Sequence, residues 1–142
     1  MPVPKLVVRA LSSTHAHLYR WTGGRLGGRM GGLEQVLLTT TGRVSGEPRT
    51  TPLAVTVVGD RLVLIASDGG AARDPGWYRN LVAQPDVVVQ RGADVRPMRA
   101  RTAAGGERAE LWRAAVANNR GYAGYQAKTA REIPVVVVEP RG

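Results

Sequence analysis

The stretch LLTTTGRVSGEPRTTPL, residues 37–53, runs from an apolar segment through threonines into a turn between two glycines, and then into a second apolar segment. Gly42 and Gly46 allow a tight turn that exposes backbone N–H groups, an arrangement that accepts anions. Arg43 and Arg49 carry guanidinium groups that can bind phosphate oxygens in pairs. The residues alone leave two interpretations open, a solvated hairpin tip and an anion-binding turn. Hydroxyl groups are supplied nearby by Thr39, Thr40, Thr41, Ser45 and Thr51.

Further strands are expected on both sides of this turn. Pro52 lacks an N–H group, so the strand that contains it must lie at a sheet edge or at a bulge. Gly59-Asp60 is a hairpin-type turn, and a second hairpin is expected around residues 92–94. Short strands joined by hairpins predict a mainly β protein with an antiparallel sheet that closes into a barrel. The predicted strands are residues 35–41, 50–58, 61–66, 87–91, 95–102 and 133–140.

The predicted helices are few and lie mostly late in the chain. Residues 76–84 form a short one, and residues 105–118 form the clearest one, with an apolar side. Residues 7–21 have the pattern of an amphipathic helix and precede a basic, glycine-rich loop. We therefore expect a basic amphipathic N-terminal segment at residues 1–32 and a β-rich domain at residues 33–142.

The composition narrows the class of partner. The chain has 142 residues, a formal charge of +9 and no cysteine. The positive balance favours an anionic partner such as a phosphorylated ligand, an anionic lipid surface or a nucleic acid. A nucleic-acid domain is disfavoured because no recognition helix or aromatic-rich strand platform is present. No segment resembles a signal peptide or a membrane span, so we expect a cytoplasmic protein with peripheral contact at the inner face of the membrane.

Side chains for self-sufficient catalysis are scarce. His15 and His17 have no acidic or sulfur ligand nearby in sequence, so no metal site is expected. No serine-nucleophile motif is present. If the protein is an enzyme, a bound cofactor must supply the chemistry. Tyr122 and Tyr125 lie three residues apart, on one face of the segment GYAGYQ if that segment is helical.

Five blocks in this order resemble one family. They are the opening stretch, ASDGGA at residues 66–71, PGWYRNL at residues 75–81, YAGYQ at residues 122–126 and IPVVVVEP at residues 133–140. Together they are similar to the deazaflavin-dependent nitroreductase family of actinobacteria, over roughly residues 20–140. The resemblance implies a split antiparallel β-barrel, like those of flavin reductases and pyridoxamine-phosphate oxidases. It also implies coenzyme F-420, a deazaflavin with a phosphate and an oligoglutamate tail, and hydride transfer to a quinone, nitroaromatic or similar acceptor.

The resemblance also implies roles for particular residues. Arg43, Ser45 and Arg49 would hold the phosphate, and a segment around Trp77 would close over the coenzyme. Tyr122 and Tyr125 would face the acceptor and act as the catalytic side chains. The full set expected at the coenzyme is Arg43, Val44, Ser45, Arg49, Thr50, Thr51, Pro52, Ile65, Ala66, Ser67, Asp68, Gly76, Trp77, Tyr78, Arg79 and Asn80.

Three residues depart from the family pattern. Val44 and Asp68 stand where lysines are common, which removes positive charge beside the expected phosphate and tail. Asn119 stands where a further tyrosine can occur. Two alternatives stay open at this point: a non-catalytic protein that carries F-420, and a barrel that binds FMN instead. A homodimer is also expected.

Overall fold

The computed structural model describes residues 29–30 and 33–141 of the chain. The amphipathic helix predicted at residues 7–21 lies outside the described residues. The described part begins with β1 (Arg29–Met30), which pairs with β2 through Arg29–Glu34 and Met30–Leu33. This strand lies on the N-terminal side of the boundary expected at residue 33.

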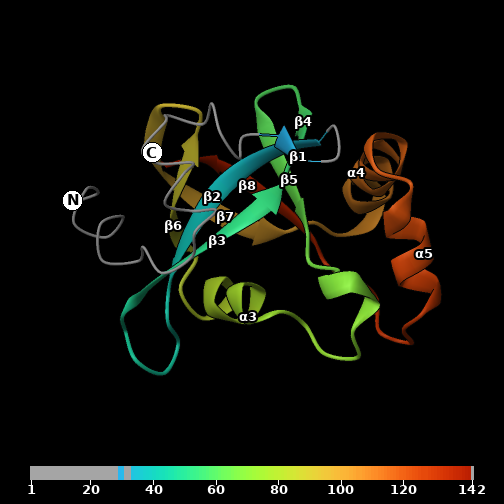
Figure 1. The fold of residues 1–142 in the computed structure, drawn as a ribbon, viewed down its shortest axis with the longest axis horizontal. Coiled ribbons are helices and arrows are strands. Elements are labelled where there is room, and N and C mark those ends of the chain that lie inside the picture. The colour runs from blue at the N-terminus through green and yellow to red at the C-terminus, as the bar shows by residue number, and fades with distance from the viewer. Residues whose placement is uncertain (1–28, 31–32, 142) are drawn as a thin grey trace.

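In the described part of the chain, eight antiparallel strands form the sheet (Figure 1). Its hydrogen-bonded order is β1-β2-β6-β7-β8-β5-β4, and β3 pairs with β2. The remaining strands are β2 (Leu33–Thr41), β3 (Pro48–Ala54), β4 (Thr56–Val58), β5 (Arg61–Ile65), β6 (Asp86–Arg91), β7 (Asp94–Thr102) and β8 (Val135–Pro140). Within the described residues, four helical elements accompany them, the 3-10 turn η1 (Asp68–Gly70) and the helices α3 (Gly76–Ala83), α4 (Gly105–Asn118) and α5 (Gly121–Ala127).

The strand predicted at residues 50–58 is divided into two, and the continuous strand is a wrong prediction. Its first half, β3, pairs with β2, whereas its second half, β4, pairs with β5 at the far end of the sheet order. One chain segment therefore joins the two ends of the sheet and closes the barrel. The chain changes partner at Val55, whose N–H donates to the carbonyl of Glu34 at 3.0 Å.

The other local predictions agree with the structure within one or two residues at the strand ends. Pro52 lies on β3, whose only neighbour in the described sheet is β2, so it has the edge position that the proline predicted. Val58 pairs with Arg61 across the predicted Gly59-Asp60 turn. Asp94 pairs with Arg91, so the next hairpin turn contains two residues rather than the expected three.

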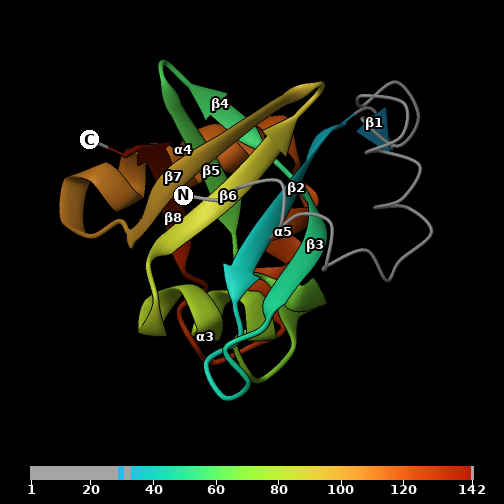
Figure 2. The same cartoon turned by 90° about the vertical axis from the view of Figure 1, so that its left-hand side faces the viewer.

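Two apolar clusters follow from the alternation of side chains along the strands. Leu62 and Leu64 point into the barrel, where Leu81 of α3 also packs. Val63 and Ile65 point to the outer face, under α4 and α5. Strands β5 and β8 are thus buried on both faces, which explains their continuous apolar runs. Figure 2 shows α3 across one end of the barrel and the α4–α5 pair behind it.

Ion pairs fasten the start of α4 to the barrel. The carboxylate of Glu107 accepts hydrogen bonds from Arg101 on β7 at 2.6 and 2.9 Å, and from Arg61 on β5 at 3.1 Å. Arg101 also donates to Glu139 of β8 at 2.9 Å. Chiefly through the hydrogen bonds from Arg101, which outweigh the opposing effect of burial, the pKa of Glu107 falls from its ordinary 4.5 to about 2.

This lowered pKa predicts an acid-dependent contribution to stability. A carboxyl whose pKa is lower in the folded state stabilises the fold above about pH 4.5, and that stabilisation is lost as the pH falls through 4.5 toward 2. Glu107→Gln should therefore lower the free energy of unfolding at pH 7, and the difference from wild type should shrink across this window. Urea unfolding at several pH values measures it. Glu110→Gln is the control, because Glu110 makes a longer contact of 3.7 Å with Arg61; an equal pH-dependent difference in both variants would contradict the assignment.

Candidate coenzyme cleft

A cleft of about 580 Å³ lies between the β2–β3 turn and the start of α3. Two arginines and one serine contribute polar groups, Trp77 contributes an aromatic wall, and no described lining residue is acidic. This combination suits a ligand that carries both a phosphate and a flat ring. The lining residues are Gly42, Arg43, Val44, Ser45, Arg49, Thr51, Gly76, Trp77 and Asn80.

The turn that forms one side of the cleft is closed by its own backbone. The N–H of Gly42 donates to the carbonyl of Glu47, and the N–H of Gly46 donates to the carbonyl of Gly42, both at 2.8 Å. Gly46 has a φ of 72°, a left-handed conformation that glycine adopts without steric cost. The Ser45 hydroxyl accepts from the N–H of Glu47 at 3.1 Å. The turn therefore has a defined shape before any ligand binds.

Asn80 ties this turn to α3. The residue is 6% exposed, and its Oδ1 accepts from the backbone N–H of Arg43 at 3.2 Å and from Nη1 of Arg43 at 2.7 Å. Its Nδ2 donates to the Thr40 hydroxyl at 3.2 Å. The Arg43 Nη1 also reaches the carbonyl of Gly76 at 3.4 Å. Asn80 thus orients one arginine of the cleft. The sequence alone shows only an amide side chain beside Leu81 in a predicted helix and does not indicate this role.

The period of two along β3 separates the predicted residues on this strand. Arg49 and Thr51 line the cleft, and Nη2 of Arg49 lies 3.4 Å from the Ser45 hydroxyl. Thr50 points to the opposite face, where its hydroxyl lies 2.7 Å from that of Thr39. Pro52 shares that opposite face by the same alternation. The threonines around the turn therefore do not all face the cleft, because Thr51 lines it and Thr50 lies on the opposite face of β3.

Residues 65–68, which the resemblance places at the coenzyme, do not line this cleft. Ile65 packs in the outer cluster beneath α4 and α5. Ala66 and Ser67 are buried, and their carbonyls accept hydrogen bonds from Arg131. Asp68 is exposed and has a φ of 45°.

The rest of the predicted α3 set divides in the same way. Tyr78 packs against the barrel interior, and its hydroxyl lies 2.9 Å from that of Thr102 on β7. Arg79 is exposed on α3 and is not among the lining residues of the cleft. The structure therefore brings together half of the sixteen residues expected at the coenzyme.

Tyr122 and Tyr125 lie on one face of α5, as the spacing predicts, with ring centroids 6.4 Å apart. Tyr122 is 7% exposed and packs in the outer cluster. Burial raises the pKa of its phenol, and a hydrogen bond with Asn119 partly opposes this shift. Tyr125 is half-buried, with the Lys128 ammonium 5.8 Å from its ring centroid. Neither side chain lines the cleft, although α5 packs directly on the η1 turn that precedes α3.

No metal site is formed by the side chains that the structure describes: no three or more His, Cys, Asp or Glu among them lie close enough together to hold an ion. Likewise, no helix within residues 29–30 and 33–141 is long and apolar enough to cross a membrane.

The chain is similar to known proteins both in sequence and in fold. An F420H(2)-dependent quinone reductase of Mycobacterium tuberculosis is 40% identical over 134 residues, which cover 89% of this chain and 88% of the relative. A solved F420-H2 dependent reductase, FDR-A, is 44% identical with a TM-score of 0.69, covering 74% of this chain and 93% of that one. A solved domain-swapped dimer has the same identity and TM-score, and the match covers 74% of this chain and 79% of that one.

More distant structures share the fold. An FAD-binding protein from Mesorhizobium loti is 13% identical with a TM-score of 0.53, and the match covers 76% of this chain and 79% of that one. The barrel is thus a split β-barrel, as the resemblance implied. The sequence profile of the F420H(2)-dependent quinone reductases matches residues 11–140. The chain therefore belongs to the F420H(2)-dependent quinone reductase family.

Proposed function

We propose that this protein transfers a hydride from reduced coenzyme F-420 to a quinone, and that the cleft beside Trp77 binds the coenzyme. The main support for the proposal is that Arg43 and Arg49 line the same cleft, in which no described lining residue is acidic. The chain also belongs to this family. Nitroaromatic acceptors are a further expectation for the same site.

The donor set of the cleft fits the anionic part of the coenzyme. Nη1 of Arg43 is engaged by Asn80 and Gly76, and among the described residues its Nε and Nη2 have no hydrogen-bond partner. Arg49 is exposed and makes one long contact with Ser45. Guanidinium groups with unused donors can form charge-assisted hydrogen bonds with a phosphate or with glutamate carboxylates. These contacts can offset the loss of charge at Val44 and Asp68.

The residues of the chain orient the ligand and exclude water. When bound, the reduced deazaflavin supplies the hydride. Asn80 and the backbone of the turn hold Arg43 in place, so the anion is bound by a preorganised group. The indole of Trp77 offers an apolar wall on which a flat ring can lie. Fixing the ring against this wall raises the rate by orientation rather than by acid–base chemistry of the protein.

Tyr125 provides a test of side-chain chemistry toward the acceptor. A quinone gains negative charge as the hydride arrives, and a nearby phenol can donate a hydrogen bond to it. Tyr125→Phe keeps the ring, and we expect it to lower kcat/KM for the quinone about tenfold, or about 1.4 kcal/mol. A proton-donor role would instead cost about a hundredfold.

Tyr122→Phe is the companion variant, because its hydroxyl is buried beside Asn119. Stopped-flow oxidation of the reduced coenzyme by a quinone measures both variants, and a binding titration checks that coenzyme affinity is unchanged. If both variants turn over several quinones at the wild-type rate, neither hydroxyl acts on the acceptor.

A titration of the full-length protein with F-420, with FMN in parallel, tests the proposed function. We expect saturable F-420 binding, weaker FMN binding and quinone-dependent oxidation of reduced F-420. Binding without acceptor-dependent oxidation would support a coenzyme carrier instead. Preferential binding of FMN would support the flavin alternative.

Two proposals about partners and one about location go further than the family assignment. The solved relative described as a domain-swapped dimer supports the homodimer expectation for this chain. We also propose that the basic segment at residues 1–32 contacts an anionic membrane surface. Most of these residues lie outside the part of the chain that the structure describes. This proposal is based on the excess of arginine over acidic residues in that segment. We also propose a cytoplasmic location for the protein.

A further inference from the structure

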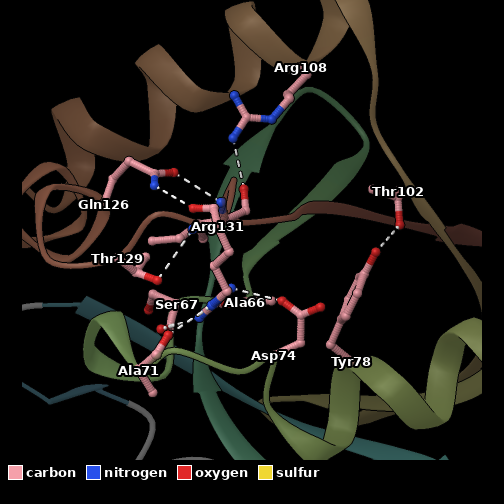
Figure 3. A network of polar contacts seen from close by, with 11 residues as sticks. Ala66, Ser67, Ala71, Asp74, Tyr78, Thr102, Arg108, Gln126, Thr129 and Arg131 are labelled. Carbon is pink, nitrogen blue, oxygen red and sulfur yellow. Dashed lines mark hydrogen bonds and ion pairs between the residues drawn. The ribbon is translucent and has the colours of Figure 1, made fainter.

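The guanidinium of Arg131 makes four polar contacts with a loop that lies far away in the sequence (Figure 3). Its Nε donates to the carbonyl of Ala71 at 2.8 Å, and Nη2 donates to the carbonyl of Ser67 at 2.8 Å. Nη1 donates to the carbonyl of Ala66 at 3.2 Å and to Oδ1 of Asp74 at 2.8 Å. The side chain is 15% exposed, so these contacts are largely shielded from water. One guanidinium therefore fixes both ends and the middle of the segment at residues 66–74.

The loop that Arg131 holds has an unfavourable backbone. Asp68, Gly69 and Gly70 are successive residues with φ values of 45°, 64° and 85°. A left-handed aspartate costs free energy, and such residues persist only where the surrounding structure determines their conformation. The neighbouring carbonyl of Ser67 accepts from Arg131 and from the N–H of Gly70, each at 2.8 Å. Arg131 thus supplies the external contacts that this loop conformation requires.

The same contacts reach the coenzyme cleft through Asp74. Pro75 follows Asp74 directly, is buried, and accepts the first hydrogen bonds of α3 from the N–H groups of Tyr78 and Arg79. Gly76 and Trp77, the next two residues, line the cleft. The start of α3 is therefore held from one side by the Arg131–Asp74 ion pair.

Arg131 itself is anchored on its own segment. The Gln126 side chain donates from Nε2 to the carbonyl of Arg131 at 2.7 Å and accepts at Oε1 from the N–H of Ile133 at 2.9 Å. Gln126 lies on α5, and Ile133 is buried in the outer cluster. The guanidinium therefore extends from a fixed base rather than from a free loop.

We propose that Arg131 is a positioning residue for the coenzyme cleft. It sets the shape of residues 66–74 and, through Asp74, the place of the Trp77 wall. This inference rests on the proposed function, because it takes the cleft to be the coenzyme site. It also joins two sets of predicted residues, since Ala66 and Ser67 act on the cleft through the loop that leads to α3.

Arg131→Lys tests the inference, because lysine keeps the charge but cannot reach four acceptors in different directions. Arg108→Lys is the matched control. Arg108 is also a half-buried arginine that donates to a backbone carbonyl, that of Ile133 at 2.8 Å, but it contacts none of residues 66–74. We expect F-420 affinity to fall about tenfold in Arg131→Lys and less than twofold in Arg108→Lys.

Hydrogen exchange provides a readout that is independent of the coenzyme. Without ligand, the amides of residues 66–76 should exchange at least tenfold faster in Arg131→Lys, whereas those of β8 should be unchanged. Asp74→Asn is the second variant should Arg131→Lys fail to fold. It keeps the three carbonyl contacts, so we expect a threefold loss of affinity with faster exchange near residue 74.

The outcomes separate the two proposals. If wild type binds F-420 and the folded Arg131→Lys variant binds within twofold of it, the positioning role is wrong. Unchanged exchange across residues 66–76 would also overturn it. If wild type does not bind F-420, the proposed function fails, and the positioning role fails with it.

Discussion

Replacing Arg49 with alanine should weaken F-420 binding about tenfold to a hundredfold. A hydrogen bond to a charged group contributes roughly 1.5–3 kcal/mol, and each 1.4 kcal/mol is about a factor of ten in affinity. Arg49 is exposed, lines the cleft and makes one contact of 3.4 Å with the Ser45 hydroxyl. Its removal should therefore cost ligand contacts while leaving the fold intact.

The measurement is a titration of each variant with oxidised F-420 at fixed ionic strength, followed by thermal unfolding without ligand. Arg113→Ala is the control, because Arg113 is exposed on α4 and its substitution lowers the net charge by the same amount as Arg49→Ala. If both variants lose the same affinity, the effect is long-range attraction to a basic protein and not a phosphate contact. Affinity within twofold of wild type in Arg49→Ala would remove Arg49 from the site.

Much of the barrel could be predicted from sequence, because it depends on local patterns. Eight of the nine residues that line the cleft were also expected at the coenzyme, but from the family resemblance, which assigned eight further residues that lie elsewhere. The period of two and the glycine turn indicate β2, β3, Arg43 in the turn between them and Arg49 near the start of β3. The division of Thr50 from Thr51 follows from the same alternation, although the resemblance assigned both to the coenzyme. The break at Val55 could not be predicted, since the two halves of one apolar run change partner only when the sheet closes.

Arg131 could not have been found from sequence either. It lies in the segment KTARE at residues 128–132, between the YAGYQ and IPVVVVEP blocks, and its loop contacts lie 57 to 65 residues earlier in the chain. Asn80 was expected at the coenzyme, but its bonds to Arg43 and Thr40 lie 37 and 40 residues away. Roles of this kind depend on tertiary contacts. The sequence shows only a polar residue in an unremarkable place.

The loop before α3 meets α5 at Gly70. An added Cβ at Gly70 would lie 2.7 Å from the carbonyl oxygen of Tyr125 and 3.1 Å from Cβ of Lys128. The φ of 85° at Gly70 also disfavours any residue with a side chain. Overpacking costs roughly 1–3 kcal/mol and a left-handed non-glycine residue about as much. We therefore expect Gly70→Ala to lower the free energy of unfolding by about 3 kcal/mol.

Gly69→Ala separates the two causes. Gly69 has a φ of 64°, but no atom lies within 4 Å of the place where its Cβ would be. This variant carries the backbone cost without the collision, so we expect a loss of about 1 kcal/mol. Urea unfolding of both variants gives the difference. Tyr125 is on α5 and the loop leads to Trp77, so Gly70→Ala should also weaken F-420 binding, whereas Gly69→Ala should have little effect. Equal destabilisation in the two variants would mean that the loop can withdraw from α5, and that the close contact with Tyr125 does not hold the loop in place.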